Sequence, residues 1–240
     1  MPESTEPATP AAGGFRSSFA EGVRDIAPVL VSTVPFGIVY GALAAQAGLS
    51  LTENVLMSGL TYAGASQFVA LELWADPLPF WTILAAVFAV NLRHVLYSAA
   101  LGRKMTAWSP LTRAAGFAFL TDPTFALAEL RGGPRLSAAY YFGLSLPLYV
   151  NWVLFTAIGA LFGNMIGEPQ RFGLDFVVTA YFLYLVASFR KRPNAVPVIA
   201  ISAAASMAVY LTAGSPWHIG AGAAAGMALA AVAAGRNAAA

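Results

Sequence analysis

A short polar cluster inside a long apolar run is the part of this sequence best equipped for chemistry. The run covers residues 77–101 and exceeds the roughly 20 residues that an α-helix needs to cross a bilayer. Its polar members are Asn91, Arg93, His94, Tyr97 and Ser98. On a helix, three- and four-residue spacings place Asn91, His94 and Ser98 on one stripe and Arg93 and Tyr97 on the next. The sequence therefore predicts a functional site on this polar arc.

Arg93 is expensive to hold inside a membrane. Insertion scales put the cost of an arginine at mid-membrane at about 2.5 to 3.5 kcal/mol. The nearest acidic residues in the sequence are Glu72 and Asp76, which precede the run. Arg93 is therefore expected to face a partner helix, a water-filled cavity or the interface. The structural alternative is that Arg93 extends along the helix to a lipid headgroup and that His94 only packs.

The composition places the chain in a lipid bilayer. Hydrophobic residues make up 58% of the 240 residues and charged residues only 10%, and the mean hydropathy is +0.68. Soluble domains carry about 25% charged residues. We therefore predict an all-α, multi-pass protein of the cytoplasmic membrane.

Several function classes are disfavoured by what the sequence lacks. The net charge is only +2, and no basic patch with interleaved aromatic residues suggests a nucleic-acid partner. The chain has no cysteine, which excludes disulfides, thiol catalysis and cysteine metal sites. It has neither a paired-histidine metal motif nor an exposed-serine elbow. We predict no cofactor, no metal and no enzymatic activity.

Eight hydrophobic segments follow a polar start. Residues 1–14 read as a disordered tail and residues 15–27 as an amphipathic lead-in helix, with a second tail at 235–240. Between them we predict one transmembrane transporter domain over 28–234. Its apolar runs are 28–47, 51–74, 77–101, 114–130, 136–162, 172–189, 196–213 and 217–234.

The second and fourth runs carry signs of a break. The second has Gly64, Ser66 and Gln67 near its middle, and the fourth has Asp122 followed by Pro123. Proline cannot donate to the helix and disfavours helical backbone at the residue before it. Broken helices in membranes are tolerated where the freed backbone is buried or lines a cavity. The alternatives are a continuous packed second helix, and an Asp122 that merely caps a half-helix.

Other residues bear on helix shape and pairing. Pro35 is a predicted break or kink in the first membrane helix, and the small pair Gly37 and Gly41 allows another helix to approach closely. Asp122 is the natural counter-ion for Arg93.

The distribution of basic residues favours re-entrant second and fourth runs. If all eight runs cross and the N-terminus is inside, four of the twelve loop and tail cations lie outside. If the two broken runs re-enter the side they left, only Arg171 lies outside. The second arrangement also suits an inverted repeat.

Several of these stretches together resemble the AzlC family. They are residues 35–41, Met57 and Ser58 leading to residues 63–68, Asn-Leu-Arg-His at 91–94 with the following residues 96–98, Thr-Asp-Pro at 121–123, and the surroundings of Asp175. The resemblance covers most of the chain from about residue 15 to residue 193. It implies the large subunit of a two-component exporter of branched-chain amino acids, in which a small membrane protein of the AzlD type is the partner.

The expected mechanism is a secondary transporter driven by the proton gradient. Gly64, Ser66 and Gln67 are placed at the substrate carboxylate, and Asp122 and freed carbonyls at the ammonium. Phe36, Phe68 and Trp152 are candidates for an apolar wall. The remaining residues predicted to bind substrate are Asn91 and Tyr97. The residues predicted to couple transport to ions are Arg93, His94, Asp122 and Asp175.

Three rival functions remain open. A channel or facilitator for a small polar solute would use the same cavity without coupling to protons. A scaffold subunit would leave the path to its partner, but it has no need for Arg93 and Asp122. An intramembrane enzyme lacks a second carboxylate spaced to work with Asp122.

Overall fold

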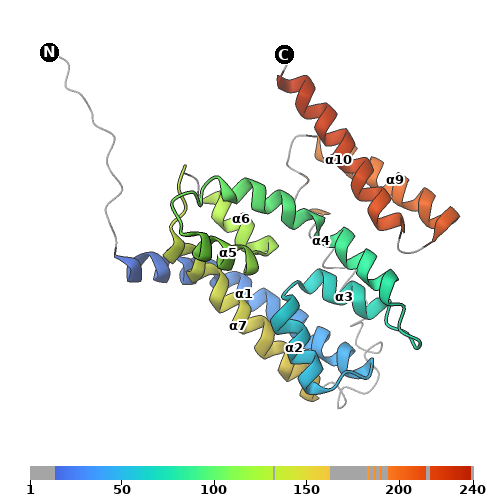
Figure 1. Cartoon of the computed structure of the whole chain (residues 1–240), viewed down its shortest axis with the longest axis horizontal. Helices are drawn as coiled ribbons and strands as arrows, with labels where there is room; N and C mark the ends of the chain where they lie inside the picture. The colour runs from blue at the N-terminus through green and yellow to red at the C-terminus, as the bar shows by residue number, and fades with distance from the viewer. Residues whose placement is uncertain are drawn as a thin grey trace. The chain divides into compact units, whose positions relative to one another are not determined.

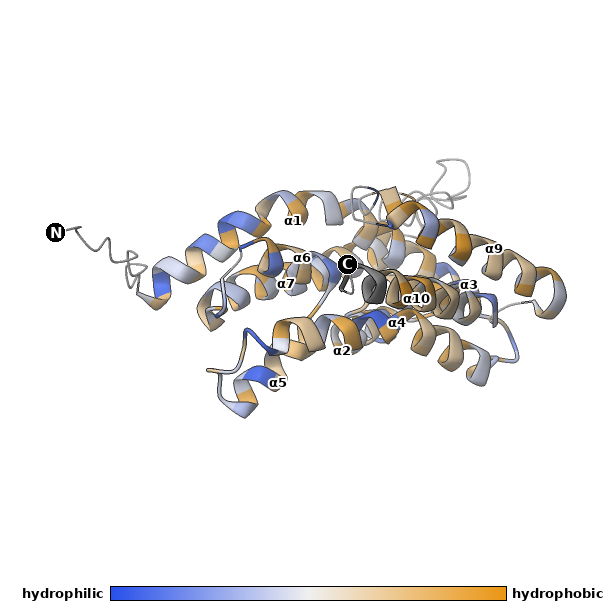
Figure 2. Ribbon diagram, turned by 90° about the horizontal axis from the view of Figure 1, so that it is seen from above, coloured by the Kyte–Doolittle hydropathy of each residue, from blue (hydrophilic) through white to orange (hydrophobic). Residues whose placement is uncertain are grey.

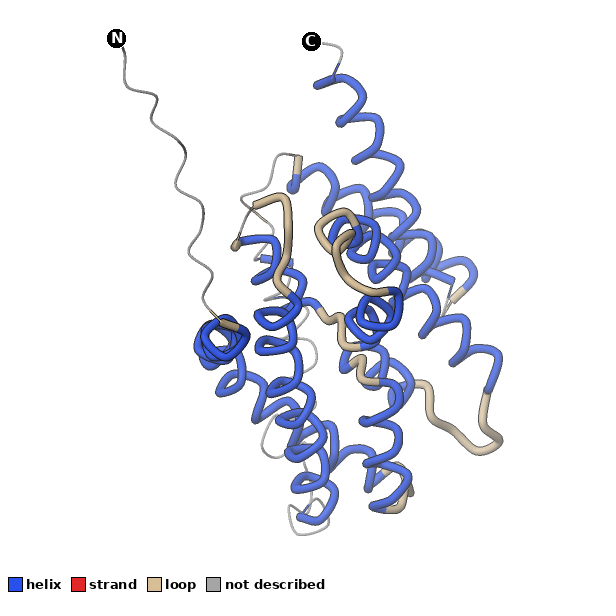
Figure 3. Tube along the Cα trace, turned by 60° about the vertical axis from the view of Figure 1, so that its left-hand side comes forward, coloured by secondary structure: helices blue, strands red, loops and turns tan. Residues whose placement is uncertain are grey.

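The described part of the chain is helical. A computed structural model describes residues 14–131, 133–162, 194–214 and 217–238, with a few isolated positions between 183 and 190 (Figures 1 and 3). The described residues form the helices α1 (Phe15–Gln46), α2 (Leu51–Thr61), α3 (Gly64–Glu72), α4 (Phe80–Gly102), α5 (Pro110–Ala118), α6 (Asp122–Leu130), α7 (Ala138–Phe162), α9 (Ala195–Ala213) and α10 (Trp217–Ala238).

Four of these helices are long and apolar enough to cross a membrane: α1, α4, α7 and α9. Polar residues of α1 gather on its first turns, whereas α9 and α10 are apolar along most of their length (Figure 2). The prediction of an all-helical, polytopic membrane protein is confirmed. Seven of the eight predicted apolar runs fall on described helices. The run at 172–189, which includes Asp175, lies outside the described residues apart from isolated positions.

Three predictions about helix boundaries differ from the structure. The lead-in at 15–27 is not a separate helix, because α1 is continuous from Phe15 to Gln46 and also passes through Pro35. Pro35 therefore does not interrupt the helix, and a kink there stays a prediction. One proline removes a single backbone hydrogen bond, and membrane helices absorb this loss when neighbours hold both sides. Likewise, α10 continues to Ala238, past the predicted end at residue 234.

The breaks in the second and fourth runs are confirmed. The second run consists of α2 and α3, with Tyr62 and Ala63 between them, and the fourth consists of α5 and α6. The four half-helices have 11, 9, 9 and 9 residues. Each is too short to cross a bilayer, which takes about 20 residues.

The chain divides into two compact units. Unit 1 holds the described residues of Met1–Val31 together with Tyr97–Leu148, and unit 2 those of Ser32–Leu96 and Tyr149–Ala240. The α5–α6 pair belongs to unit 1 and the α2–α3 pair to unit 2, while α1, α4 and α7 contribute residues to both. A single domain over 28–234 stays a prediction.

In unit 1, the α5–α6 pair begins and ends at the same place. Lys104, just before α5, forms a 2.9 Å ion pair with Glu129 in the last turn of α6. The carbonyl of Lys104 also accepts a 3.0 Å hydrogen bond from the amide of Leu136, which follows α6. The chain therefore leaves this pair where it entered, as a re-entrant segment does.

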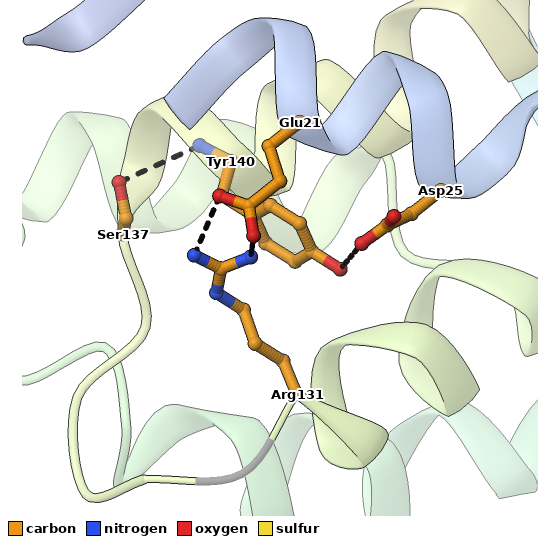
Figure 4. A network of polar contacts seen from close by, with 5 residues as sticks. All are labelled: Glu21, Asp25, Arg131, Ser137 and Tyr140. Atoms are coloured by element: carbon orange, nitrogen blue, oxygen red, sulfur yellow. Dashed lines mark hydrogen bonds and ion pairs between the residues drawn. The ribbon is translucent and has the colours of Figure 1, made fainter. Parts of the chain in front are cut away.

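A polar network fastens the first turns of α1 to this end of unit 1. The Arg131 guanidinium forms two hydrogen bonds with the Glu21 carboxylate and lies 3.9 Å from the centre of the Tyr140 ring (Figure 4). The Tyr140 hydroxyl donates to Asp25 at 2.8 Å. The hydrogen bonds that Arg131 donates to the Glu21 carboxylate raise the pKa of Arg131. Glu21 and Asp25 are one turn apart on α1, so both carboxylates face α6 and α7.

In unit 2, glycines let α1 and α7 touch through their backbones. A Cβ added at Gly41 would lie 2.1 Å from the carbonyl oxygen of Thr156, and one at Gly159 would lie 2.1 Å from that of Ile38. The close approach predicted for the small pair at Gly37 and Gly41 is therefore present. Helices α9 and α10 pack against each other as a hairpin (Figure 1).

Candidate functional site

The break between α2 and α3 is built from a strained turn. Tyr62 follows α2 in the left-handed conformation, with φ 41°, and its amide bonds to the carbonyl of Ser58 at 3.2 Å. A residue with a side chain pays about 1 kcal/mol or more for this conformation, which glycine adopts freely. The Tyr62 ring is buried and packs edge-on against Tyr149, with ring centres 4.9 Å apart. Packing thus holds the break open at a position where the local backbone resists it.

The N-terminus of α3 has no side-chain cap. Its N-cap is Ala63, which has no side-chain oxygen to accept from the first amides. The next residues are Gly64, Ala65 and Ser66, so no carboxylate lies in the first turn. The first amides of a helix have no partner within the helix and carry the positive end of its dipole. The local sequence therefore supplies neither a side-chain cap nor a carboxylate at this end of α3, where the helix dipole favours an anion.

Ser66 connects this site to α4. Its hydroxyl donates a 2.8 Å hydrogen bond to Oδ1 of Asn91. Ser66 is fully buried and Asn91 is half-buried. Because Asn91 accepts through Oδ1, its Nδ2 group keeps its two donors. The structure thus brings together two of the predicted substrate-binding residues.

A chain of four buried side chains fastens both halves of the broken helix to α7. Nε1 of Trp152 donates to Oε1 of Gln67, Nε2 of Gln67 donates to Ser58, and Ser58 donates to Thr156. Each of these hydrogen bonds is 3.0 Å long. Ser58 lies on α2 and Gln67 on α3, while Trp152 and Thr156 lie one turn apart on α7. We call this chain the Gln67 network.

Aromatic rings surround the start of α3. Ring carbons of Trp152 lie 3.0 and 3.1 Å from where a Cβ on Gly64 would stand. Tyr40 stacks on Trp152 with ring centres 6.0 Å apart, and it meets the edge of Phe68 at 5.6 Å. Three of the predicted substrate-binding residues, Gly64, Phe68 and Trp152, therefore lie together. Tyr40 joins them and was not predicted.

The N-terminus of α6, in unit 1, carries polar side chains of its own. Asp122 is the first residue of the helix, and its Oδ1 accepts a 2.9 Å hydrogen bond from the Tyr97 hydroxyl. The Thr124 hydroxyl accepts from the amide of Thr121 at 2.8 Å, and Pro123 has no amide to satisfy. The Tyr97 ring stacks on Phe125, with ring centres 4.1 Å apart. The first turn of α6 therefore contains a carboxylate, whereas the first turn of α3 contains none.

The polar arc of α4 is less exposed than the apolar residues that follow it. Asn91, Arg93 and His94 are half-buried, whereas the neighbouring Val95 and Leu96 are 64% and 57% exposed. Arg93 belongs to unit 2 and Asp122 to unit 1. Their predicted pairing stays a prediction, as do the coupling roles of Arg93, His94 and Asp122. Asp175 lies outside the described residues.

Comparison with known proteins assigns the family. The family described as AzlC protein matches residues 28–166, more than half of the chain. The chain is 33% identical over 197 residues to the inner membrane protein YgaZ of Escherichia coli, covering 79% of this chain and 80% of that protein. This chain belongs to the AzlC family.

Two further relatives have names that describe a membrane protein and a transport protein. An uncharacterized membrane protein of Archaeoglobus fulgidus is 32% identical over 173 residues, covering 70% of this chain and 74% of that protein. A Bacillus subtilis protein named branched-chain amino acid transport protein AzlC is 27% identical over 173 residues, covering 71% and 66%. No solved structure matches the chain.

Some residues of the site in this AzlC-family chain were not predicted from its sequence. Ser58, Thr156 and Asn54 are fully buried, and Nδ2 of Asn54 donates to the carbonyl of Gly41 at 2.8 Å. Asn54 and Ser58 are one turn apart on α2, and this four-residue spacing of polar side chains in an apolar run was the available signal. Among the described residues, no group of three or more metal-ligating side chains comes together.

Proposed function

We propose that this AzlC-family chain is a secondary transporter that exports branched-chain amino acids and is driven by the proton gradient. The observation that carries the proposal is the bare amide end of α3 beside aromatic rings in unit 2. The name of the Bacillus subtilis relative supports the substrate class. A small AzlD-type membrane protein is its proposed partner, on the strength of the family resemblance.

The break offers both poles that a zwitterion needs. The amides at Gly64, Ala65 and Ser66 receive the substrate carboxylate, together with Nδ2 of Asn91. The last carbonyls of α2 carry the negative end of its dipole and receive the ammonium. Trp152 and Phe68 form the wall for the aliphatic side chain. Each group is presented by unit 2.

Coupling to protons is proposed for the ionisable residues. Histidine titrates near neutral pH, which suits His94 on the half-buried arc of α4. Asp122 is a half-buried carboxylate held by Tyr97. Intramembrane ionisable residues mark ion and proton pathways in transporters by default. No catalytic role is proposed for either residue.

Filling the bare helix end tests the carboxylate site. The substitution Ala63→Asp places a carboxylate at the N-cap of α3, one position before the place that Asp122 has in the first turn of α6. A capping residue stabilises a helix by about 0.5 to 2 kcal/mol. We therefore expect unchanged or higher thermal stability and a rise of about tenfold or more in the leucine concentration that half-saturates transport, since tenfold corresponds to about 1.4 kcal/mol of lost binding.

The same assay separates this site from a general defect. Leucinol, which lacks the carboxylate, should compete poorly with leucine in the parent protein. Ala63→Ser, which caps without a charge, should weaken leucine transport less than Ala63→Asp. Normal leucine affinity in a stable Ala63→Asp protein would show that the carboxylate binds elsewhere.

A further inference from the structure

Gln67 uses its side-chain amide within the protein. Its Oε1 accepts from Trp152 and its Nε2 donates to Ser58, and the residue is fully buried. An amide group of this kind has two acceptor positions and two donors. One of each is therefore already engaged, in a direction fixed by Trp152, whose indole nitrogen can only donate.

The Gln67 network replaces hydrogen bonds that the break removes. A continuous helix would bond α2 to α3 along the backbone, but the strained turn at Tyr62 interrupts that ladder. Ser58 and Gln67 lie on opposite sides of the break and both reach α7, through Thr156 and Trp152. The network thus fixes each half-helix to the same face of one long helix.

The network also decides where the Trp152 ring lies. The indole is held through Nε1 by Gln67, and its ring carbons sit against Gly64 at the start of α3. Tyr40 stacks behind it. An indole without the hydrogen bond to Gln67 can rotate, which would change the space beside the amides of α3.

We propose that Gln67 is a positioning residue that sets side-chain specificity by fixing the Trp152 ring over Gly64, and not a ligand of the substrate's charged groups. The specificity part rests on the proposed amino acid transport. A ligand of groups common to all amino acids changes every affinity by one factor. A residue that orients the side-chain wall changes the ratios between amino acids.

The indole hydrogen bond itself can be measured without transport. The chain has five tryptophans, so ¹⁵N-tryptophan labelling in nanodiscs gives five indole N–H signals, and the Trp152 signal is the one lost in Trp152→Phe. We expect slow exchange of this proton with solvent deuterium, and exchange about tenfold faster in Gln67→Met, as for one lost hydrogen bond. The four other signals, unchanged, show that the variant is folded.

Transport ratios test the specificity. We expect Gln67→Met and Trp152→Phe each to lower the preference for leucine over alanine and phenylalanine, and the double variant to match the single ones, because the two residues act through one contact. Trp81→Phe is the matched control, since Trp81 is 77% exposed and should leave the ratios unchanged.

Two results would overturn the inference. Unaltered exchange of the Trp152 proton in Gln67→Met would show that Gln67 does not hold the ring. Equal loss of affinity for all amino acids in Gln67→Met, with ratios preserved, would make Gln67 a substrate ligand. A parent protein that transports no amino acid refutes the proposed function and the specificity claim, while the exchange measurement still decides whether Gln67 holds Trp152.

Discussion

Asp122→Asn is expected to abolish uphill export of leucine. Asparagine has nearly the same shape, can still accept the hydrogen bond from Tyr97 and still begins α6, so the fold of unit 1 should persist. It cannot carry a proton. We expect the initial rate of leucine export against a gradient to fall by about 100-fold, which is the lower end of what a positioned proton carrier contributes to a rate. Exchange of labelled for unlabelled leucine without a gradient should survive.

Controls for Asp122 are available on the same helix. Glu129 lies in the last turn of α6 and pairs with Lys104, so Glu129→Gln removes a carboxylate without touching the proposed path and should leave export unchanged. Tyr97→Phe keeps the stacking on Phe125 but removes the hydrogen bond to Asp122. We expect this variant to lower the rate of uphill export by about tenfold, as for the loss of one hydrogen bond. Full uphill export by Asp122→Asn would show that protons travel by another residue.

Gly41→Ala is expected to destabilise the protein strongly. The added Cβ would lie 2.1 Å from the carbonyl oxygen of Thr156 and 2.7 Å from the amide nitrogen of Ala160, both backbone atoms that cannot rotate away. The helices α1 and α7 must separate to admit it. Overpacking of this kind costs about 3 kcal/mol, the upper end of the usual range. The loss should appear as a lower melting temperature in detergent.

Gly220→Ala provides the matched comparison. Gly220 also lies inside a helix, α10, but an added Cβ there would meet no atom within 4 Å. Alanine is the better helix former by about 1 kcal/mol, so this variant should be neutral or slightly more stable. Equal stability of Gly41→Ala and Gly220→Ala would mean that α1 and α7 do not touch through their backbones.

The positions of the two broken helices were predictable from local sequence, although packing at Tyr62 is needed to hold the break between α2 and α3. Pro123 suits the first turn of a helix better than its interior, and the small residues around Gly64 provide few side-chain contacts to protect a continuous helix. The continuity of α1 through Pro35 was not predictable from local preference, because packing on glycines in both units overrides the cost of one proline.

The contacts within the site depend on tertiary packing. Ser58 and Thr156 are 98 residues apart, and their pairing follows from the way α2 and α7 pack together. In apolar runs, periodicity gives little information about which face is buried, since lipid and protein neighbours select similar side chains. The stripe of Asn54 and Ser58 on α2 was therefore visible but not distinctive. Ser66, Gln67 and Asn91 were predictable as a group from their polarity alone.

Efflux of labelled leucine from preloaded cells tests the central claim most directly. Cells would express the chain alone or with a small AzlD-type protein, with and without an uncoupler of the proton gradient. We predict rapid efflux that requires the chain, is strongest with the partner and stops with the uncoupler. Efflux that the uncoupler leaves unchanged would indicate a passive pore, and retention of leucine under every condition would contradict export of branched-chain amino acids.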